Sequence, residues 1–123
     1  MKHLTIIVPD GENNLSSIVG AYKLFTRANE FWQRKYRKQL FKLELAGLSR
    51  EVDFYGGLFS VKPHCAVSAI RKTNLIIIPS LNHNYREAIQ NNQELIDWIS
   101  QQHRKGAEIA SICTGAFLLA SSG

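Results

Sequence analysis

The first candidate for chemistry in the chain is Cys113, which lies in the sequence Ser-Ile-Cys-Thr-Gly at residues 111–115. An apolar stretch typical of a buried strand, residues 107–112, precedes it, and a run of good helix formers, residues 116–120, follows it. Cys113 is therefore expected at a sharp turn from a strand into a helix. The first N–H groups of a helix favour a thiolate or an oxyanion at such a turn.

Two neighbours of Cys113 favour a pocket at this turn. Gly115 lets another backbone approach closely, and the amide of Thr114 could donate to an oxyanion. The segment thus predicts either a nucleophile or a thiol that lines a ligand pocket. The alternative is that Cys113 is a small apolar residue that fills the junction between strand and helix.

A cysteine nucleophile needs a base, and the candidates lie in two loops. His83 is the only histidine in a loop predicted at the carboxyl edge of the sheet, and a solvated loop histidine is the alternative. Glu12, on the first loop, could polarise the thiol or could be an ordinary exposed acid. Asp10 has the same two interpretations, and it could also shape its turn.

Polar residues of the same loops are candidates for binding a small molecule. Ser17 could face the pocket, or it could cap the first helix together with Asn14. Asn82 and Asn84 could hydrogen-bond to a ligand or close an Asx turn. Ser80 and Leu81 follow Pro79, where a strand is predicted to end.

The elements that position these residues follow from hydrophobic periodicity. Strands are expected at residues 4–8, 40–45 (suited to a sheet edge), 74–78 and 108–112. One amphipathic helix presents its apolar face through Ile18, Ala21, Tyr22, Phe25, Ala28 and Trp32, before a basic break at 34–39, and another covers 94–103. Residues 52–61 predict a hairpin around two glycines, residues 66–71 are either a helical turn or irregular, and residues 80–85 are a loop.

Strands that alternate with amphipathic helices predict an α/β fold, in which a parallel sheet carries helices on both faces. Ligands of such sheets bind outside the carboxyl ends of the strands. The loops 9–14, 79–85 and 113–115 all follow strands, so they are expected to share one pocket although they are far apart in the sequence.

Composition restricts the function further. The chain has 123 residues, of which 45% are hydrophobic, and a net charge of +5, with four cations among the five residues 34–38. That basic cluster permits contact with nucleic acid, but it also suits a solvated helix end. Cys65 and Cys113 have no spacing typical of a metal or disulfide site, so we expect a reducing cytoplasm, no metal and no cofactor. No apolar run approaches the length of a membrane span.

The string Cys-Thr-Gly-Ala-Phe-Leu-Leu-Ala at residues 113–120, with the strand that leads into it, resembles the elbow of class I glutamine amidotransferase-like domains. Within that superfamily it most resembles the PfpI-like sensor half of AraC-type transcriptional regulators, which carry a C-terminal helix-turn-helix DNA-binding domain. Residues 4–8, 20–25, 28–29 and 75–79 resemble other segments of the domain. The resemblance spans nearly the whole chain, and the elbow is its specific part.

This resemblance implies a flavodoxin-like three-layer sandwich with a mostly parallel sheet and a small hairpin insertion, truncated at its C-terminal end. Residues 1–123 would be a partial PfpI-like domain, and the rest of it, with any helix-turn-helix domain, would lie beyond this chain. We expect a sheet that lacks its last elements to expose the face they cover. Such a sheet would dimerise over that surface or rearrange its end.

Three departures from the pattern of the enzymes bear on catalysis. The resemblance places Ser17 where the enzymes have an acidic residue that touches the elbow cysteine. Ser80 and Leu81 stand where the enzymes have glycines in the oxyanion loop, and the later histidine of the family would lie beyond Gly123.

These departures favour a sensor. We therefore predict a ligand-sensing and dimerisation domain, without catalysis, that reaches DNA only through another domain. The ligand site would comprise loop and elbow residues, namely Cys113, Thr114, Gly115, Ser17, Ser80, Leu81, Asn82, His83 and Glu12. One alternative is a PfpI-type hydrolase, hydratase or deglycase with Cys113 as its nucleophile. Another is direct binding of nucleic acid by residues 34–38.

Overall fold

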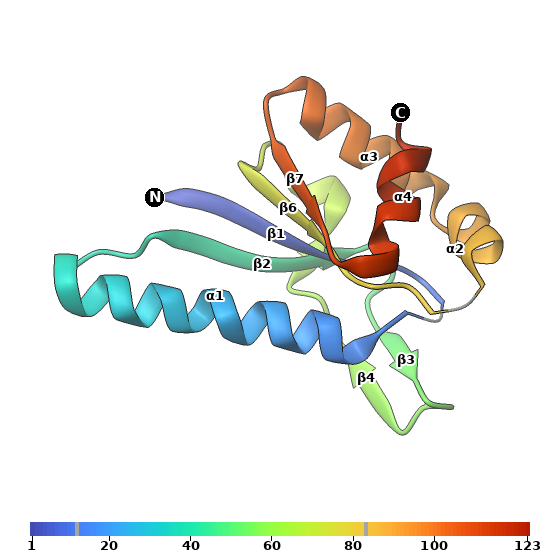
Figure 1. The fold of residues 1–123 in the computed structure, drawn as a ribbon, viewed down its shortest axis with the longest axis horizontal. Helices are drawn as coiled ribbons and strands as arrows, with labels where there is room; N and C mark the ends of the chain where they lie inside the picture. The colour runs from blue at the N-terminus through green and yellow to red at the C-terminus, as the bar shows by residue number, and fades with distance from the viewer. Residues whose placement is uncertain (12, 83) are drawn as a thin grey trace.

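The computed structural model describes residues 1–11, 13–82 and 84–123. Its centre is a parallel sheet in the order β5-β2-β1-β6-β7 (Figure 1). The strands are β1 (Lys2–Val8), β2 (Phe41–Gly47), β5 (Cys65–Ala66), β6 (Leu75–Ile78) and β7 (Glu108–Ser111). This arrangement confirms the predicted α/β class.

Strand β1 lies in the middle of the sheet because its β-branched residues are suited to burial on both faces. It is fully buried from Leu4 to Val8. In register, Leu4 is paired with Leu43 of β2 on one side and with Leu75 of β6 on the other. The parallel pairing brings the carboxyl ends of these strands to one edge of the sheet.

Helices cover both faces of the sheet, as the alternation of elements predicts. Helix α1 (Leu15–Tyr36) packs Ile18 and Ala21 against one face, in a cluster with Leu4. Helices α2 (Tyr85–Asn91), α3 (Gln93–Arg104) and α4 (Ala116–Ser121) cover the opposite face (Figure 1). Asn14 caps α1 as predicted, because its side chain accepts a hydrogen bond from the Ser17 amide.

The predicted hairpin is present as an antiparallel pair, β3 (Val52–Phe54) and β4 (Phe59–Val61). Its turn is tight because three successive residues, 55–57, have positive φ. Val52 and Phe54 join the core on the α1 side, whereas Tyr55, Leu58 and Phe59 remain exposed. Two short 3₁₀ helices, η1 (Val67–Ala69) and η2 (Cys113–Gly115), complete the described elements.

Four details differ from the sequence prediction. Helix α2 was not predicted. Strand β2 is not the edge strand, because the two-residue β5 pairs with it. Residues 66–71 contribute to both β5 and η1. The break predicted at 34–39 begins later than expected, because α1 continues to Tyr36. Arg37 follows as its C-cap, in the left-handed conformation. Arg34 and Lys35 lie in the last turn, where cations complement the helix dipole.

Within the described residues, every helix is too short or too polar to cross a membrane.

Candidate functional site

The turn at Cys113 has the geometry that the sequence predicts. Strand β7 is followed by Ile112, whose N–H donates to the Ile78 carbonyl at 2.9 Å, and then by η2 and α4. Cys113 has φ +50° and an exposed side chain. A residue other than glycine rarely adopts this conformation, so the turn holds the thiol in a strained position at the carboxyl edge.

Gly115 lets the elbow pack directly on the end of the neighbouring strand. A Cβ atom at this position would lie 2.5 Å from the Pro79 carbonyl oxygen and 2.9 Å from that of Ile78. Both distances are shorter than side chains tolerate, so only glycine fits without a shift of the backbone. The close approach joins residues 113–115 to the loop after β6.

The Thr114 hydroxyl bonds to both residues of that loop that follow Pro79. The Leu81 amide donates to Thr114 Oγ1 at 2.9 Å, and Thr114 Oγ1 lies 2.7 Å from the Leu81 carbonyl oxygen. Ser80 Oγ and Thr114 Oγ1 are 3.0 Å apart. The side chain of Thr114 therefore fixes the loop to the elbow.

Ser17 brings the first loop and α1 into the same network. Its hydroxyl accepts a hydrogen bond from the Ser80 amide at 3.0 Å and donates to the Asn14 carbonyl at 2.7 Å. The Asn14 amide donates in return to the Ser80 carbonyl at 2.8 Å. Asn82 Nδ2 adds a bond to the Asn13 carbonyl at 3.3 Å. The three loops predicted to share one edge do lie together.

This network determines what the site can do chemically. The amides of Ser80 and Leu81 both point at side-chain hydroxyls of the chain itself, so neither is directed at an open oxyanion position. Glu12 and His83, the other proposed partners of the thiol, lie outside the described residues. Over residues 1–11, 13–82 and 84–123, no side chain hydrogen-bonds to Cys113 and no cluster of His, Cys, Asp and Glu could hold a metal ion.

A cavity of about 500 Å³ opens beside this network, between the first loop and the hairpin. Asn13 and Asn82 line it from the loops, and Asp53 and Tyr55 line it from the hairpin. Of these residues only Asn82 belongs to the predicted ligand site. The sequence predicts the hairpin itself, but a hairpin pattern carries no signal for where the hairpin folds relative to the sheet.

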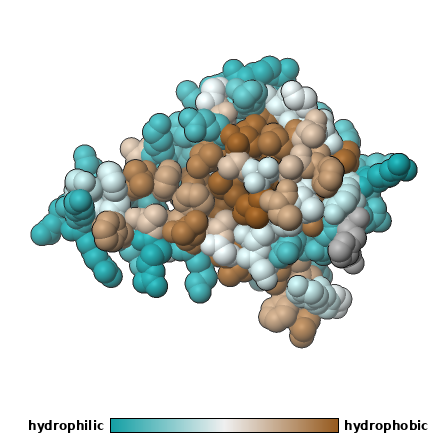
Figure 2. Space-filling model, viewed as in Figure 1, coloured by the Kyte–Doolittle hydropathy of each residue, from teal (hydrophilic) through white to brown (hydrophobic). Residues whose placement is uncertain are grey.

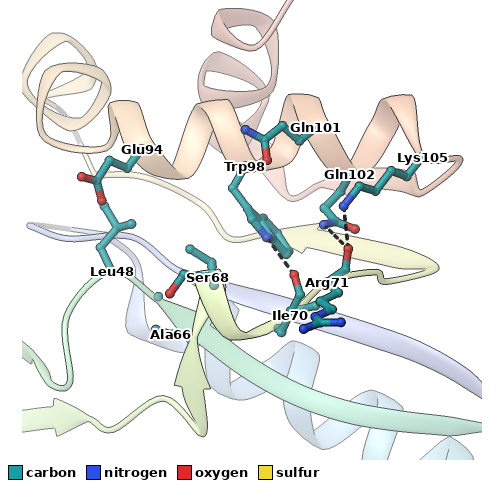
Figure 3. Close-up of a pocket in the computed structure, with 12 residues that line it drawn as sticks. Leu48, Ala66, Ser68, Ile70, Arg71, Glu94, Trp98, Gln101, Gln102 and Lys105 are labelled. Atoms are coloured by element: carbon teal, nitrogen blue, oxygen red, sulfur yellow. Dashed lines mark hydrogen bonds between the residues drawn. The ribbon is translucent and has the colours of Figure 1, made fainter.

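A second cavity, of about 470 Å³, lies between α3 and the segment around η1 (Figure 3). Its polar groups mostly hold the structure together. Trp98 Nε1 donates to the Ile70 carbonyl at 3.4 Å, and both Gln102 Nε2 and Lys105 Nζ donate to the Arg71 carbonyl. Figure 3 shows the side chains of Trp98, Gln102 and Lys105 directed at that segment. We interpret this cavity as a seam between elements.

A further polar cluster, which the sequence does not predict, joins three strands. The Glu44 carboxylate lies 2.8 Å from His3 Nε2 and accepts the Cys65 thiol at 3.4 Å. The hydrogen bond with His3 holds the pKa of Glu44 below its usual value, and burial raises the pKa of the Cys65 thiol. The same carboxylate thus bridges β1, β2 and β5.

Comparison with solved structures identifies the fold. The chain superimposes on a protein of Vibrio parahaemolyticus that is assigned as a transcriptional regulator, with a TM-score of 0.81 and 27% identity, over 99% of this chain and 61% of that protein. An AraC family transcriptional regulator of Pseudomonas putida matches with a TM-score of 0.76 and 16% identity, over 100% of this chain and 62% of that regulator. A ThiJ/PfpI family protein of Pseudomonas syringae matches with a TM-score of 0.76 and 15% identity, over 98% of this chain and 46% of that protein.

No family model matches the sequence, and no curated protein matches it significantly. The chain has the fold of the DJ-1/ThiJ/PfpI superfamily, and transcriptional regulators are among its structural relatives. The predicted resemblance is confirmed for the fold and for its similarity to transcriptional regulators. The chain spans about 61% of the length of the Vibrio protein and 62% of the Pseudomonas putida regulator.

Proposed function

We propose that the chain is the ligand-sensing and dimerisation domain of an AraC-type transcriptional regulator of the cytoplasm, and that it does not catalyse a reaction. The observation that carries this proposal is that the amides of the loop after β6 already donate to hydroxyls of the chain itself. Because the Ser17 and Thr114 hydroxyls bind the Ser80 and Leu81 amides, the loop after β6 lacks the open donors that acyl chemistry uses. The similarity to regulators over the whole chain supports the same function.

The network also offers a route from a ligand to the rest of the molecule. Ser17 lies in the first turn of α1, Thr114 lies just before α4, and both bind the loop after β6. A ligand that displaces Ser80 or Leu81 would therefore move two helices on opposite faces of the sheet. Contact with DNA would come through a separate helix-turn-helix domain.

An apolar area on one face offers a surface for dimerisation. Figure 2 shows it over β6 and β7, between α1 and α4. Ala110 is exposed there although its register partner, Ile77, is buried beneath the same face. A second copy of the chain is the partner that we propose for this area.

The function is tested by deleting the gene and complementing it. We expect transcript levels of its target genes to change on deletion and to return with the wild-type gene. A Cys113→Ser gene should restore them equally, because sensing without chemistry needs no nucleophile. Unchanged transcripts after deletion would contradict the regulator. Failure of Cys113→Ser, with normal protein levels, would contradict the claim that no chemistry is involved.

A PfpI-type hydrolase, hydratase or deglycase remains the second candidate, and one observation favours it. The exposed thiol of Cys113, held at φ +50°, is presented outward at the turn. Alkylation by iodoacetamide distinguishes the two functions. In a sensor, Cys113 should react as an ordinary exposed thiol. A hydrolase predicts rapid alkylation together with turnover of an ester such as p-nitrophenyl acetate that Cys113→Ser abolishes.

A further inference from the structure

Three Arg-Lys pairs recur at the same distance before three strands of the parallel sheet. The pairs are residues 37–38, 71–72 and 104–105, and the second residue of each lies three positions before the start of β2, β6 or β7. Lys2 opens β1, which lies between β2 and β6. Because these strands are parallel, the three pairs and Lys2 lie at one edge of the sheet, opposite the elbow. This surface is named the amino edge below.

Hydrogen bonds join the amino edge into one continuous surface. The Lys2 amide donates to the Leu40 carbonyl at 3.1 Å, which ties β1 to the loop before β2. The Glu108 amide donates to the Asn74 carbonyl at 2.9 Å, which ties β7 to the loop before β6. Figure 1 shows the start of β1, marked N, on the same side of the molecule as the end of α1 and the start of β2. Three strand spacings of about 4.8 Å separate β2 from β7, so the surface is about 14 Å wide.

The positive charges of the amino edge are exposed and are not neutralised by neighbouring acids. All seven cationic residues are exposed, and none of the ion pairs among residues 1–11, 13–82 and 84–123 involves them. Lys105 Nζ donates to a backbone carbonyl, which leaves its charge unpaired. The segments 34–40, 70–74 and 103–107 contain no acidic residue, and Glu108 at the start of β7 is the acid that follows most closely.

Helix dipoles account for only part of this pattern. Residues 34–35 and Arg104 lie in the last turns of α1 and α3, where cations are favourable. Residues 71–72 follow only the three-residue helix η1, whose dipole is small, so they have no such reason to be basic. At the opposite edge the charges are mixed, since Arg50 stands beside Glu51 in the loop after β2. The concentration of one sign at the amino edge therefore indicates an anionic partner.

We propose that the amino edge binds the phosphate backbone of double-stranded DNA, independently of its sequence. A duplex carries one negative charge per about 1.7 Å of its axis, so a surface about 14 Å wide meets several phosphates. The cations lie mostly in short loops and not along a helix or a ribbon, which are the elements that read base edges in the major groove. The choice of DNA rests on the proposed regulator function. It adds a contact by this chain to that of a separate DNA-binding domain.

The residues beside the Arg-Lys pairs favour DNA over an anionic lipid surface. Between each pair and its strand lies an exposed residue that is not apolar, namely Gln39, Asn74 or Gly106. Segments that bind a lipid surface combine their cations with apolar side chains that enter the membrane interface. The loops of the amino edge thus offer phosphate contacts without an apolar anchor.

The test is fluorescence anisotropy of the purified chain with two labelled duplexes of unrelated sequence, in about 50 to 200 mM NaCl. We expect both duplexes to bind with equal affinity. The logarithm of the binding constant should fall with the logarithm of the salt concentration with a slope of about −3 or steeper, as expected for several phosphate contacts. The double variant Arg71→Gln with Lys72→Gln should make this slope shallower by about 1 to 2 and weaken binding to both duplexes alike.

Arg50→Gln with Lys62→Gln is the matched control, because it removes the same charge from exposed cations that flank the hairpin. This control should leave the slope unchanged. Equal effects of the two double variants would overturn the proposal, because net charge alone would then explain binding. No binding by the wild type, or tighter binding to phosphatidylglycerol vesicles at equal phosphate concentration, would also overturn it. The proposed sensing function would stand after each of these results, since it places DNA contact in a separate domain.

Discussion

Gly115 is the residue at which the backbone geometry of the elbow is most demanding. Replacing it with alanine would put a Cβ atom 2.5 Å from a carbonyl oxygen at the end of β6. We expect Gly115→Ala to lower the free energy of unfolding by about 1–3 kcal/mol, the usual cost of a forced core shift. Urea denaturation measures this.

Gly20 is the control, because a Cβ atom there meets nothing within 4 Å and the residue lies inside α1. Gly20→Ala should instead raise the free energy of unfolding by about 0.5–1 kcal/mol. If both variants were equally stable, the elbow would not depend on close packing at residue 115.

Thr114 tests the loop network without changing the size of the side chain. Thr114→Val removes the hydroxyl, so the Leu81 amide loses its acceptor. We expect a loss of about 1–3 kcal/mol in the free energy of unfolding, measured by thermal denaturation. Thr114→Ser keeps the hydroxyl and should retain most of the stability. A serine variant as unstable as the valine variant would show that the methyl group matters and the hydrogen bonds do not.

Glu44 makes the stability depend on pH. Its folded pKa is lowered mainly by the hydrogen bond with His3, so its contribution is fully present above the unfolded value near 4.5. That contribution is lost as the pH falls from there through the folded pKa. We expect Glu44→Gln to flatten the decline of stability below pH 4.5. Urea denaturation at several pH values measures this decline. A decline as steep as in the wild type would contradict this role.

At the scale of elements, the strongest patterns were predicted correctly. Strands β1 and β6 are nearly continuous β-branched runs, and α1 has a clear apolar stripe. Helix α2 was missed because it buries only Ala88, so its seven residues show no periodicity. Its start is nevertheless encoded in the sequence. Asn84 accepts a hydrogen bond from the Glu87 amide, and Asn84 Nδ2 bonds to the Glu87 carboxylate.

The seam between α3 and the segment before β6 depends on one buried amide. Gln102 is 1% exposed, accepts the Thr73 amide at 3.0 Å and donates to the Arg71 carbonyl at 3.1 Å. Gln102→Leu keeps the volume but leaves the Thr73 amide without an acceptor, whereas the Arg71 carbonyl keeps its bond from Lys105 Nζ. We expect a loss of about 1–3 kcal/mol in the free energy of unfolding and faster hydrogen exchange at the Thr73 amide. The exposed neighbour Gln101 is the control, and Gln101→Leu should change stability by less than about 0.5 kcal/mol.

At the scale of the molecule, the sequence predicted that three distant loops meet at one edge, because parallel strands bring their carboxyl ends together. It did not predict which atoms would bond there. The pairing of Ser17 with Ser80 and of Thr114 with Leu81 depends on side-chain directions that no periodicity encodes. The hairpin cavity was missed because Asp53 and Asn13 are 40 residues apart in the sequence, and no pattern indicates that they line one cavity.

The apolar area over β6 and β7 predicts self-association of the whole chain. Ala110 is exposed on the face that α1 partly covers, where its register partner Ile77 is buried. If a second copy covers this area, Ala110→Glu would bury a charge without a partner, which strongly opposes association. We expect sedimentation equilibrium to show a dimer for the wild type and a monomer for Ala110→Glu. Ala66→Glu, at the exposed opposite edge of the sheet, should leave the dimer intact. A wild-type monomer, or equal dissociation by both variants, would exclude this face as the interface.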